Sequence, residues 1–319
     1  MHVEPDAQEA VADRTRLLER MHGVLDRAEL MPFSRDVLRH PAAVEIVHAA
    51  QRALRSGQLA PHQRRALADR LDRVPRPAFG PAAPQDHLLR SVARALRSIP
   101  PQEGMDGQPV TAEVAAWREP EREVLAEALD LLTRAWPESA AEVGQTVVEI
   151  ALLAGDAIDG FTDFTVHGAV LINRRRLAAS SAGLPGPVRL AEALVHEGAH
   201  TRCNAAAAAE PFLLADRPAA SGVSGGSAEV LVATPLRADP RPLTGLFQQA
   251  VVLARSVLLY RRLVGLTSAV GAPAVGARYE SLVNSAHQAV DTLSGHARML
   301  TERGHQVLTE CAIAVGSTA

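Results

Sequence analysis

The sequence has 319 residues, a formal net charge of −3, and 33 basic residues that are all arginine. This charge balance, without a basic cluster, argues against a nucleic-acid partner, and an aromatic content of 3% argues against a base-stacking surface. A composition of 47% hydrophobic and 22% charged residues is typical of a folded globular protein and argues against general disorder.

The first third of the chain is predicted to be helical. Apolar residues recur there at helical spacing, and Pro32 ends the first run. Two segments rich in proline or glycine interrupt the pattern. The expected elements are a helix at 8–31, two helices within 34–73 that separate near 57–61, a linker or long loop at 74–85, a short helix at 88–99 and a break at 100–109.

Beyond residue 110, longer helices alternate with short apolar strands. The sequence therefore predicts a mainly α fold with a small β element (α+β), divided into an N-terminal helical region (1–110) and a second domain (111–319). The expected elements are helices at 121–135, 138–153, 187–204, 243–265 and within 279–314, strands at 167–173 and 229–234, loops at 156–165 and 210–226, and an extended or turned segment with three prolines at 235–242.

The cellular location is predicted from the cysteines and the apolar runs. Cys203 and Cys311 lie far apart and form no CxxC pattern, which favours a reducing compartment. The N-terminal residues MHVEPDAQEA lack the apolar region of a secretory signal. We find no apolar run of the ~20 residues that span a bilayer, so we predict a cytoplasmic protein without a membrane partner.

Residues 190–200, LAEALVHEGAH, contain the motif HExxH. His196 and His200 are four residues apart, so on a helix both imidazoles lie on one face and can bind one metal ion at about 2.1 Å. Glu197 lies beside them and can reach a metal-bound water, as the general base of metallopeptidases does. We therefore predict a metal site on a zincin-like helix, with His196 and His200 as ligands and Glu197 as the catalytic residue.

The third metal ligand is not defined by the usual extensions of this motif. The metzincin pattern requires glycine and histidine at positions where this sequence has Cys203 and Ala206. The thermolysin-like solution is a later glutamate, and Glu210 and Glu229 lie at suitable distances along the chain, although neither is in a clear helix.

Three segments resemble the HExxH-motif peptide-modification family of ribosomal natural-product (RiPP) gene clusters. They are HGAVLIN at 167–173, LAEALVHEGAH at 190–200 and, most specific, PLRADPRPLTGLFQQ at 235–249. Members of this family occur alone or fused to radical-SAM enzymes. Some are similar to iron(II)- and 2-oxoglutarate-dependent oxygenases that hydroxylate the β-carbon of residues in a precursor peptide.

The resemblance implies Fe(II) and 2-oxoglutarate as cofactors. The distal carboxylate of the keto acid needs a cation, for which the resembling segment offers Arg241, our first choice, and Arg237. In some relatives we expect a histidine near the first turn of the following helix, where this sequence has Phe247, Gln248 and Gln249. The third metal position is thus left to Gln248, to Glu229 or Asp216, or to no side chain.

Three functions follow as alternatives. The first is iron(II)- and 2-oxoglutarate-dependent hydroxylation of a peptide or amino-acid-like substrate in natural-product biosynthesis. The second is a zinc metallopeptidase or other hydrolase with Glu197 as general base. The third is a non-catalytic partner that presents a precursor peptide, and the N-terminal helices would suit binding of such a peptide or of a partner enzyme. His167, at the start of its strand, is a further candidate for substrate contact.

Overall fold

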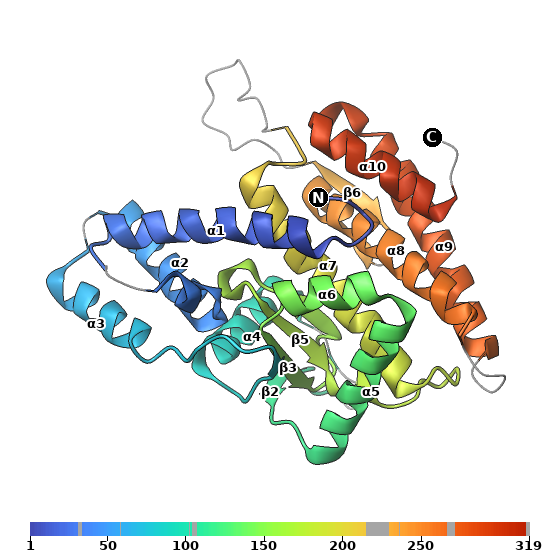
Figure 1. Cartoon of the computed structure of the whole chain (residues 1–319), viewed down its shortest axis with the longest axis horizontal. Helices are drawn as coiled ribbons and strands as arrows, with labels where there is room; N and C mark the ends of the chain where they lie inside the picture. The colour runs from blue at the N-terminus through green and yellow to red at the C-terminus, as the bar shows by residue number, and fades with distance from the viewer. Residues whose placement is uncertain are drawn as a thin grey trace.

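The computed structural model describes residues 1–30, 34–57, 59–101, 103, 107–214, 230–235, 237–266 and 272–316, with the backbone alone at 237–239. Helices dominate these residues, and a small mixed sheet lies among them (Figure 1). This confirms the predicted fold class, mainly α with a small β element. The zincin-like character of the motif helix stays a prediction.

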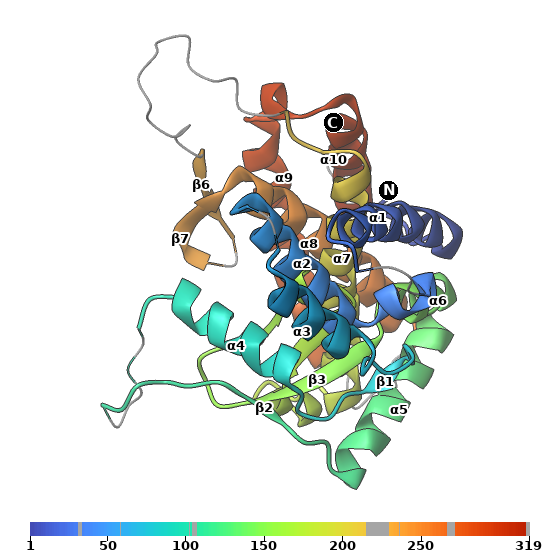
Figure 2. The same ribbon diagram turned by 90° about the vertical axis from the view of Figure 1, so that its left-hand side faces the viewer.

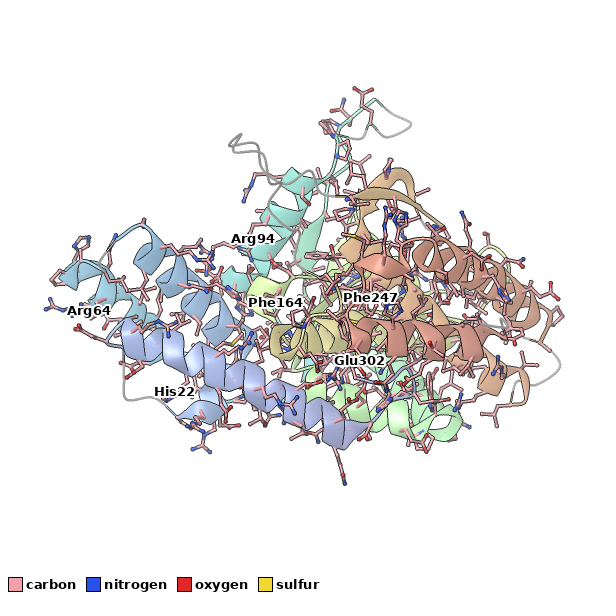
Figure 3. All side chains as sticks on the ribbon, turned by 90° about the horizontal axis from the view of Figure 1, so that it is seen from above. His22, Arg64, Arg94, Phe164, Phe247 and Glu302 are labelled. Carbon is pink, nitrogen blue, oxygen red and sulfur yellow. The ribbon has the colours of Figure 1, made fainter. Side chains whose placement is uncertain are left out.

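The N-terminal helices α1, α2 and α3 share an apolar core, which Ala205 of α7 also joins, and lie to the left of the sheet in Figure 1. Asp6 caps α1 by accepting hydrogen bonds from the amides of Gln8 and Glu9. Viewed from above, Arg64 lies at the far end of this group and Phe247 among the C-terminal helices (Figure 3). The elements, which confirm the predicted helices, are α1 (Ala7–Arg27), η1 (Arg35–Arg39), α2 (Pro41–Arg55), α3 (Pro61–Leu71) and α4 (Asp86–Ser98).

The main sheet is centred on β3, which pairs in parallel with β1 and β5 and antiparallel with β2, while β4 forms an antiparallel edge beside β5. In β3 and β5 alternate residues point to opposite faces. Ile150 and Val170 pack with α5, α6 and α7, whereas Ala151 and Leu171 pack with α4. The strands are β1 (Gly80–Pro81), β2 (Glu113–Ala115), β3 (Glu149–Ala154), β4 (Gly160–Thr162) and β5 (Ala169–Asn173).

Three predicted segments differ from the structure, all of them at this sheet. The helix expected over 138–153 is wrong in its second half, because the chain leaves the helix after Thr146 and forms β3 from Glu149. A strand buried on both faces is apolar almost throughout and lacks the alternation that marks a half-exposed strand. The expected loops at 156–165 and 74–85 contain β4 and β1, which are too short to leave a pattern of their own.

The C-terminal helices form a second helical layer around α7 and α8, and a separate two-stranded hairpin stands at its edge (Figure 2). This layer has one continuous apolar core. The remaining described elements of the chain, inside and outside this layer, are α5 (Glu119–Ala135), α6 (Pro137–Thr146), η2 (Phe164–Val166), η3 (Arg174–Leu177), α7 (Gly186–Ala209), β6 (Leu231–Thr234), β7 (Arg237–Pro242), α8 (Leu243–Val264), α9 (Ala272–Ser294), η4 (Ala297–Met299) and α10 (Glu302–Val315).

Buried charges join the N-terminal helix to the rest of the fold. Arg202 of α7 is fully buried and forms ion pairs with Asp13 and Glu9 of α1. Arg255 of α8 pairs with Glu142 of α6 and donates hydrogen bonds to backbone carbonyls of the first residues. These contacts cross the predicted boundary near residue 110, and the division into two domains stays a prediction.

Helix α8 is long and apolar enough, by length and composition, to cross a membrane, with a mean hydropathy of 1.3. The expectation that no apolar run reaches this length is wrong for α8, although the helix itself was predicted at 243–265. In the structure 78% of its apolar window is buried inside the fold, and the core helix of a globular protein meets the same criterion. The helix is therefore weak evidence for a membrane span.

Candidate metal centre

The HExxH residues lie in the middle of α7, which packs against α1, α5, α6 and α8 and against strands β4 and β5. This wide burial explains why the helix is apolar on most sides. Pro187 lies in the first turn, where its missing amide N–H is not needed. Gly186 is required beside it, because an added Cβ would collide with the carbonyl oxygen of Leu177.

His196 and His200 lie together on one face of α7, with ring centroids 5.1 Å apart. Both rings are half-buried, so the face that carries them is not sealed by the core. Burial lowers the pKa of both imidazoles, and the charges of Arg176 and Arg278 lower the pKa of His196 further. Both rings are therefore neutral at pH 7, and each keeps one nitrogen lone pair for a metal ion.

A chain of hydrogen bonds orients His200. Oε1 of Gln248, on α8, accepts from Nδ1 of His200 at 2.9 Å, and Nε2 of Gln248 donates to Oδ1 of Asn204 at 2.9 Å. With its proton on Nδ1, His200 offers the lone pair of Nε2 to an ion. In this arrangement Gln248 positions a ligand, and its role as the third ligand itself stays a prediction.

Glu197 points away from this chain of hydrogen bonds, towards the edge strand β4. Its side chain is buried, and its Oε2 has no hydrogen-bond partner. Burial raises the pKa of this carboxyl to about 8. A Cβ added to Gly160 of β4 would lie 2.9 Å from Oε1, so a glycine at this position leaves the room that Glu197 occupies.

The predicted carboxylate ligands do not complete the site within the described part of the chain. Glu229 and Asp216 lie outside the described residues. Glu210 caps the end of α7, about 15 Å along the helix from His200, and pairs with Arg303 at 2.8 Å. Among the described residues, no His, Cys, Asp or Glu joins His196 and His200 in a group of three donor atoms within 4.8 Å.

The two predicted anchors for the keto acid lie in the hairpin that precedes α8. Arg241 is half-buried in β7, opposite Val232, and the side chain of Arg237 lies outside the described residues. The sequence analysis missed Arg176 and Arg278, whose charges act on His196. Arg176 is the last residue of an arginine run directly after β5, and this run could have marked it as a candidate. The sequence around Arg278 on α9 contains no comparable signal.

Arg176 and Arg278 are each held by an acidic residue. Arg176 donates to Asp159 through Nε at 2.8 Å and through Nη2, and Arg278 pairs with Glu192, one turn before His196. The side chains of Arg176 and Arg278 are 25% and 34% exposed. Each can therefore present its remaining N–H groups to an anion beside the histidine pair.

Two further histidine sites are defined by the fold. His167 precedes β5 and is buried against Phe164, with ring centroids 5.9 Å apart, and burial lowers its pKa to about 4. A buried group formed by His40, His87 and Glu149 lies in the N-terminal part, and the sequence analysis missed it because these residues are far apart in the chain.

The comparisons with known proteins do not assign the chain to a family. No protein-family model matches the sequence, and a search of curated proteins finds no relative. The argument for function therefore depends on the residues of α7 and their surroundings.

Proposed function

We propose that this protein is a metal-dependent modification enzyme that hydroxylates a peptide or amino-acid-like substrate with Fe(II) and 2-oxoglutarate. The observation that carries the proposal is the pair His196 and His200 on one half-buried face of α7, with Gln248 orienting one ring. Two neutral imidazoles suit Fe(II), and the remaining coordination positions stay open for a keto acid and O₂. The reaction would convert 2-oxoglutarate, O₂ and a C–H group into succinate, CO₂ and an alcohol.

Several arginines near the histidine pair could bind the distal carboxylate of 2-oxoglutarate. Arg176 and Arg278 place positive charge beside His196, and Arg241 and Arg237 lie in the hairpin before α8. A guanidinium binds a carboxylate with two parallel hydrogen bonds. Any of these four arginines is a candidate for the distal carboxylate of 2-oxoglutarate. The substrate is either a small molecule or a precursor peptide, with or without a partner enzyme.

One observation favours a second function, a zinc hydrolase. Glu197 is adjacent to the histidine pair, where a carboxylate can take a proton from a metal-bound water. Burial raises its pKa to about 8, and a metal ion beside it would lower this pKa towards neutral pH, where a general base is effective. In the oxygenase, Glu197 need not carry a proton and would orient a metal-bound group. Substituting this residue therefore separates the two functions.

The test is anaerobic addition of Fe(II) and 2-oxoglutarate to the full-length protein, with visible absorption recording the chelate between them. We expect a charge-transfer band that is absent in a His196→Ala/His200→Ala variant and present in a His62→Ala/His305→Ala control, which changes two exposed histidines. Glu197→Gln should keep the band. Absence of the band, together with one tightly held Zn²⁺ per chain that the His196→Ala/His200→Ala variant loses, would contradict the oxygenase and favour the hydrolase. Absence of any metal that depends on these two histidines would favour a peptide-presenting partner.

A further inference from the structure

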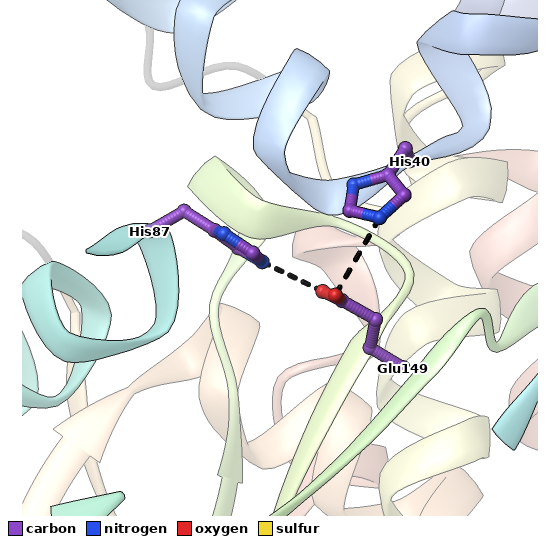
Figure 4. A group of neighbouring side chains, drawn as sticks. All are labelled: His40, His87 and Glu149. Atoms are coloured by element: carbon purple, nitrogen blue, oxygen red, sulfur yellow. Dashed lines mark hydrogen bonds and ion pairs between the residues drawn. The ribbon is translucent and has the colours of Figure 1, made fainter. Parts of the chain in front are cut away.

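His40, His87 and Glu149 form a buried group far from α7 in the sequence (Figure 4). His40 is the cap of α2, His87 lies in the first turn of α4, and Glu149 is the first residue of β3. Nε2 of His87 lies 2.6 Å from Oε2 of Glu149, and Nε2 of His40 lies 3.6 Å from Oε1. Both rings thus direct a nitrogen at one carboxylate.

We infer that these three residues form a metal site for a divalent transition ion such as Zn²⁺ or Fe²⁺. Two imidazoles and one carboxylate are a ligand set that such ions prefer. Donor atoms bound to one ion at ~2.1 Å are about 3.0–3.5 Å apart. The observed separations of 2.6 and 3.6 Å lie below and above this range, and the three donor atoms lie within 4.8 Å of one another, so the side chains would have to shift to hold an ion.

Burial and charge favour an ion at this position. The side chains of His87, His40 and Glu149 expose only 3%, 4% and 7% of their surface. A carboxylate at this depth needs a compensating charge, and within the described residues its ion-pair partners are the two imidazoles. A divalent ion would supply this positive charge.

The group is not sealed from the surface. His87 also lines a cavity of about 330 Å³ between α2, α3 and α4, together with Arg70, Arg73 and Arg90. Arg70 and Arg90 are held there by Glu45, at 2.9 and 2.7 Å. The cavity gives an ion a route to His87, and its arginines suit a small anionic ligand in any coordination position that the protein leaves open.

The ligands differ in how readily they can bind. Nδ1 of His40 accepts a hydrogen bond from the amide of Ala42 at 3.2 Å, which places its proton on Nε2. Coordination through Nε2 would move this proton to Nδ1 and break the hydrogen bond that caps the helix. His87 and Glu149 are therefore the principal ligands, and His40 is the weaker third.

The test uses the full-length His196→Ala/His200→Ala protein, so that its result does not depend on the function proposed above. After metal removal with a chelator, Co²⁺ is titrated while visible absorption is recorded, and Zn²⁺ competition gives the affinity. We expect one ion per chain. Adding Glu149→Gln should weaken binding by more than about 100-fold, beyond the effect of residues that only orient a ligand. His48→Gln, at another buried histidine nitrogen on α2, should leave the affinity unchanged.

A second measurement guards against loss of folding. Zn²⁺ should raise the melting temperature of the His196→Ala/His200→Ala protein by mass action, and Glu149→Gln should abolish this rise while circular dichroism stays unchanged. If Glu149→Gln unfolds the chain, His87→Gln serves in the same comparison. No Co²⁺ binding by the His196→Ala/His200→Ala protein, or binding that Glu149→Gln leaves intact, would overturn the inference and make the group a hydrogen-bonded network.

Discussion

Replacing Gln248 with leucine removes the acceptor that holds the proton of His200 on Nδ1. The ring then loses its preference for a lone pair on Nε2, and Nδ1 is left half-buried without its partner. An unsatisfied buried donor costs about 1–3 kcal/mol. Loss of a residue that orients a metal ligand typically weakens metal binding by about 10–100-fold, which corresponds to about 1.4–2.7 kcal/mol. The two free energies overlap, so we expect the Kd for the metal ion to rise by about 10–100-fold.

The assay is competition titration with Zn²⁺ in a Glu149→Gln background, so that only the site on α7 contributes. Gln248→Glu should rescue the affinity, because a carboxylate accepts the Nδ1 proton at least as well as an amide. The matched control is Gln249→Leu, which removes a neighbouring amide whose Oε1 is buried without a hydrogen-bond partner. That change should leave the affinity within about threefold, below the effect of a ligand-orienting residue.

Two results would refute this reasoning. An unchanged affinity in Gln248→Leu would mean that the hydrogen bond does not orient the ligand. Equal losses in Gln248→Leu and Gln249→Leu would point to packing of α8 rather than to the ring of His200. Gln248→His distinguishes the two roles of this residue, because only a side chain that faces the ion would tighten binding when it becomes an imidazole.

Three further predictions test the surroundings of the site. Gly160→Ala should lower the melting temperature, because the added Cβ would crowd the carboxyl group of Glu197. Adding Glu197→Ala should recover the melting temperature. Gly144→Ala, whose Cβ would meet nothing within 4 Å, should not lower the melting temperature. Burial lowers the pKa of His167 to about 4, against 6.5 in the unfolded chain, so the unfolded state takes up a proton first as the pH falls. The free energy of unfolding, measured by urea titration, should therefore fall by up to about 3 kcal/mol between pH 6.5 and pH 4. His167→Leu should flatten this pH dependence. Arg202→Met leaves the buried Asp13 without its main partner and should cost about 3–5 kcal/mol in the same assay, whereas Arg16→Met, at the exposed partner of Asp13, should cost less than about 1 kcal/mol.

Local sequence patterns were sufficient to predict elements whose structure depends on neighbouring residues alone. The motif helix, the apolar α8 and the extended proline segment before it were predictable, because spacing, proline positions and hydrophobicity act within a few residues. The hydrogen bond between His200 and Gln248 depends on the packing of α8 against α7, which no local pattern specifies. A polar residue in the second turn of a largely apolar helix was the available signal.

Local patterns did not predict the sheet or the group of His40, His87 and Glu149. The sequence of β3 is compatible with a helix or a strand. Its pairing with β1 and β5, which are separated from it along the chain, makes it a strand. His40, His87 and Glu149 come together only because α2 and α4 pack at the start of this strand. Contacts of such sequence separation have no periodic trace, so a search for short motifs cannot find them.

The two candidate centres differ in what an oxygenase would still require. A keto acid occupies two positions of an octahedral ion and O₂ a third, so three protein ligands complete the site. His40, His87 and Glu149 offer three, in a buried position beside an arginine-lined cavity. The described part of the chain offers two histidines on α7, and the third position is left to Gln248, to Asp216 or Glu229, or to solvent. The chelate band therefore assigns the chemistry: loss only in His196→Ala/His200→Ala places it on α7, and loss only in Glu149→Gln would move it to the N-terminal group and leave α7 with a hydrolytic or structural role.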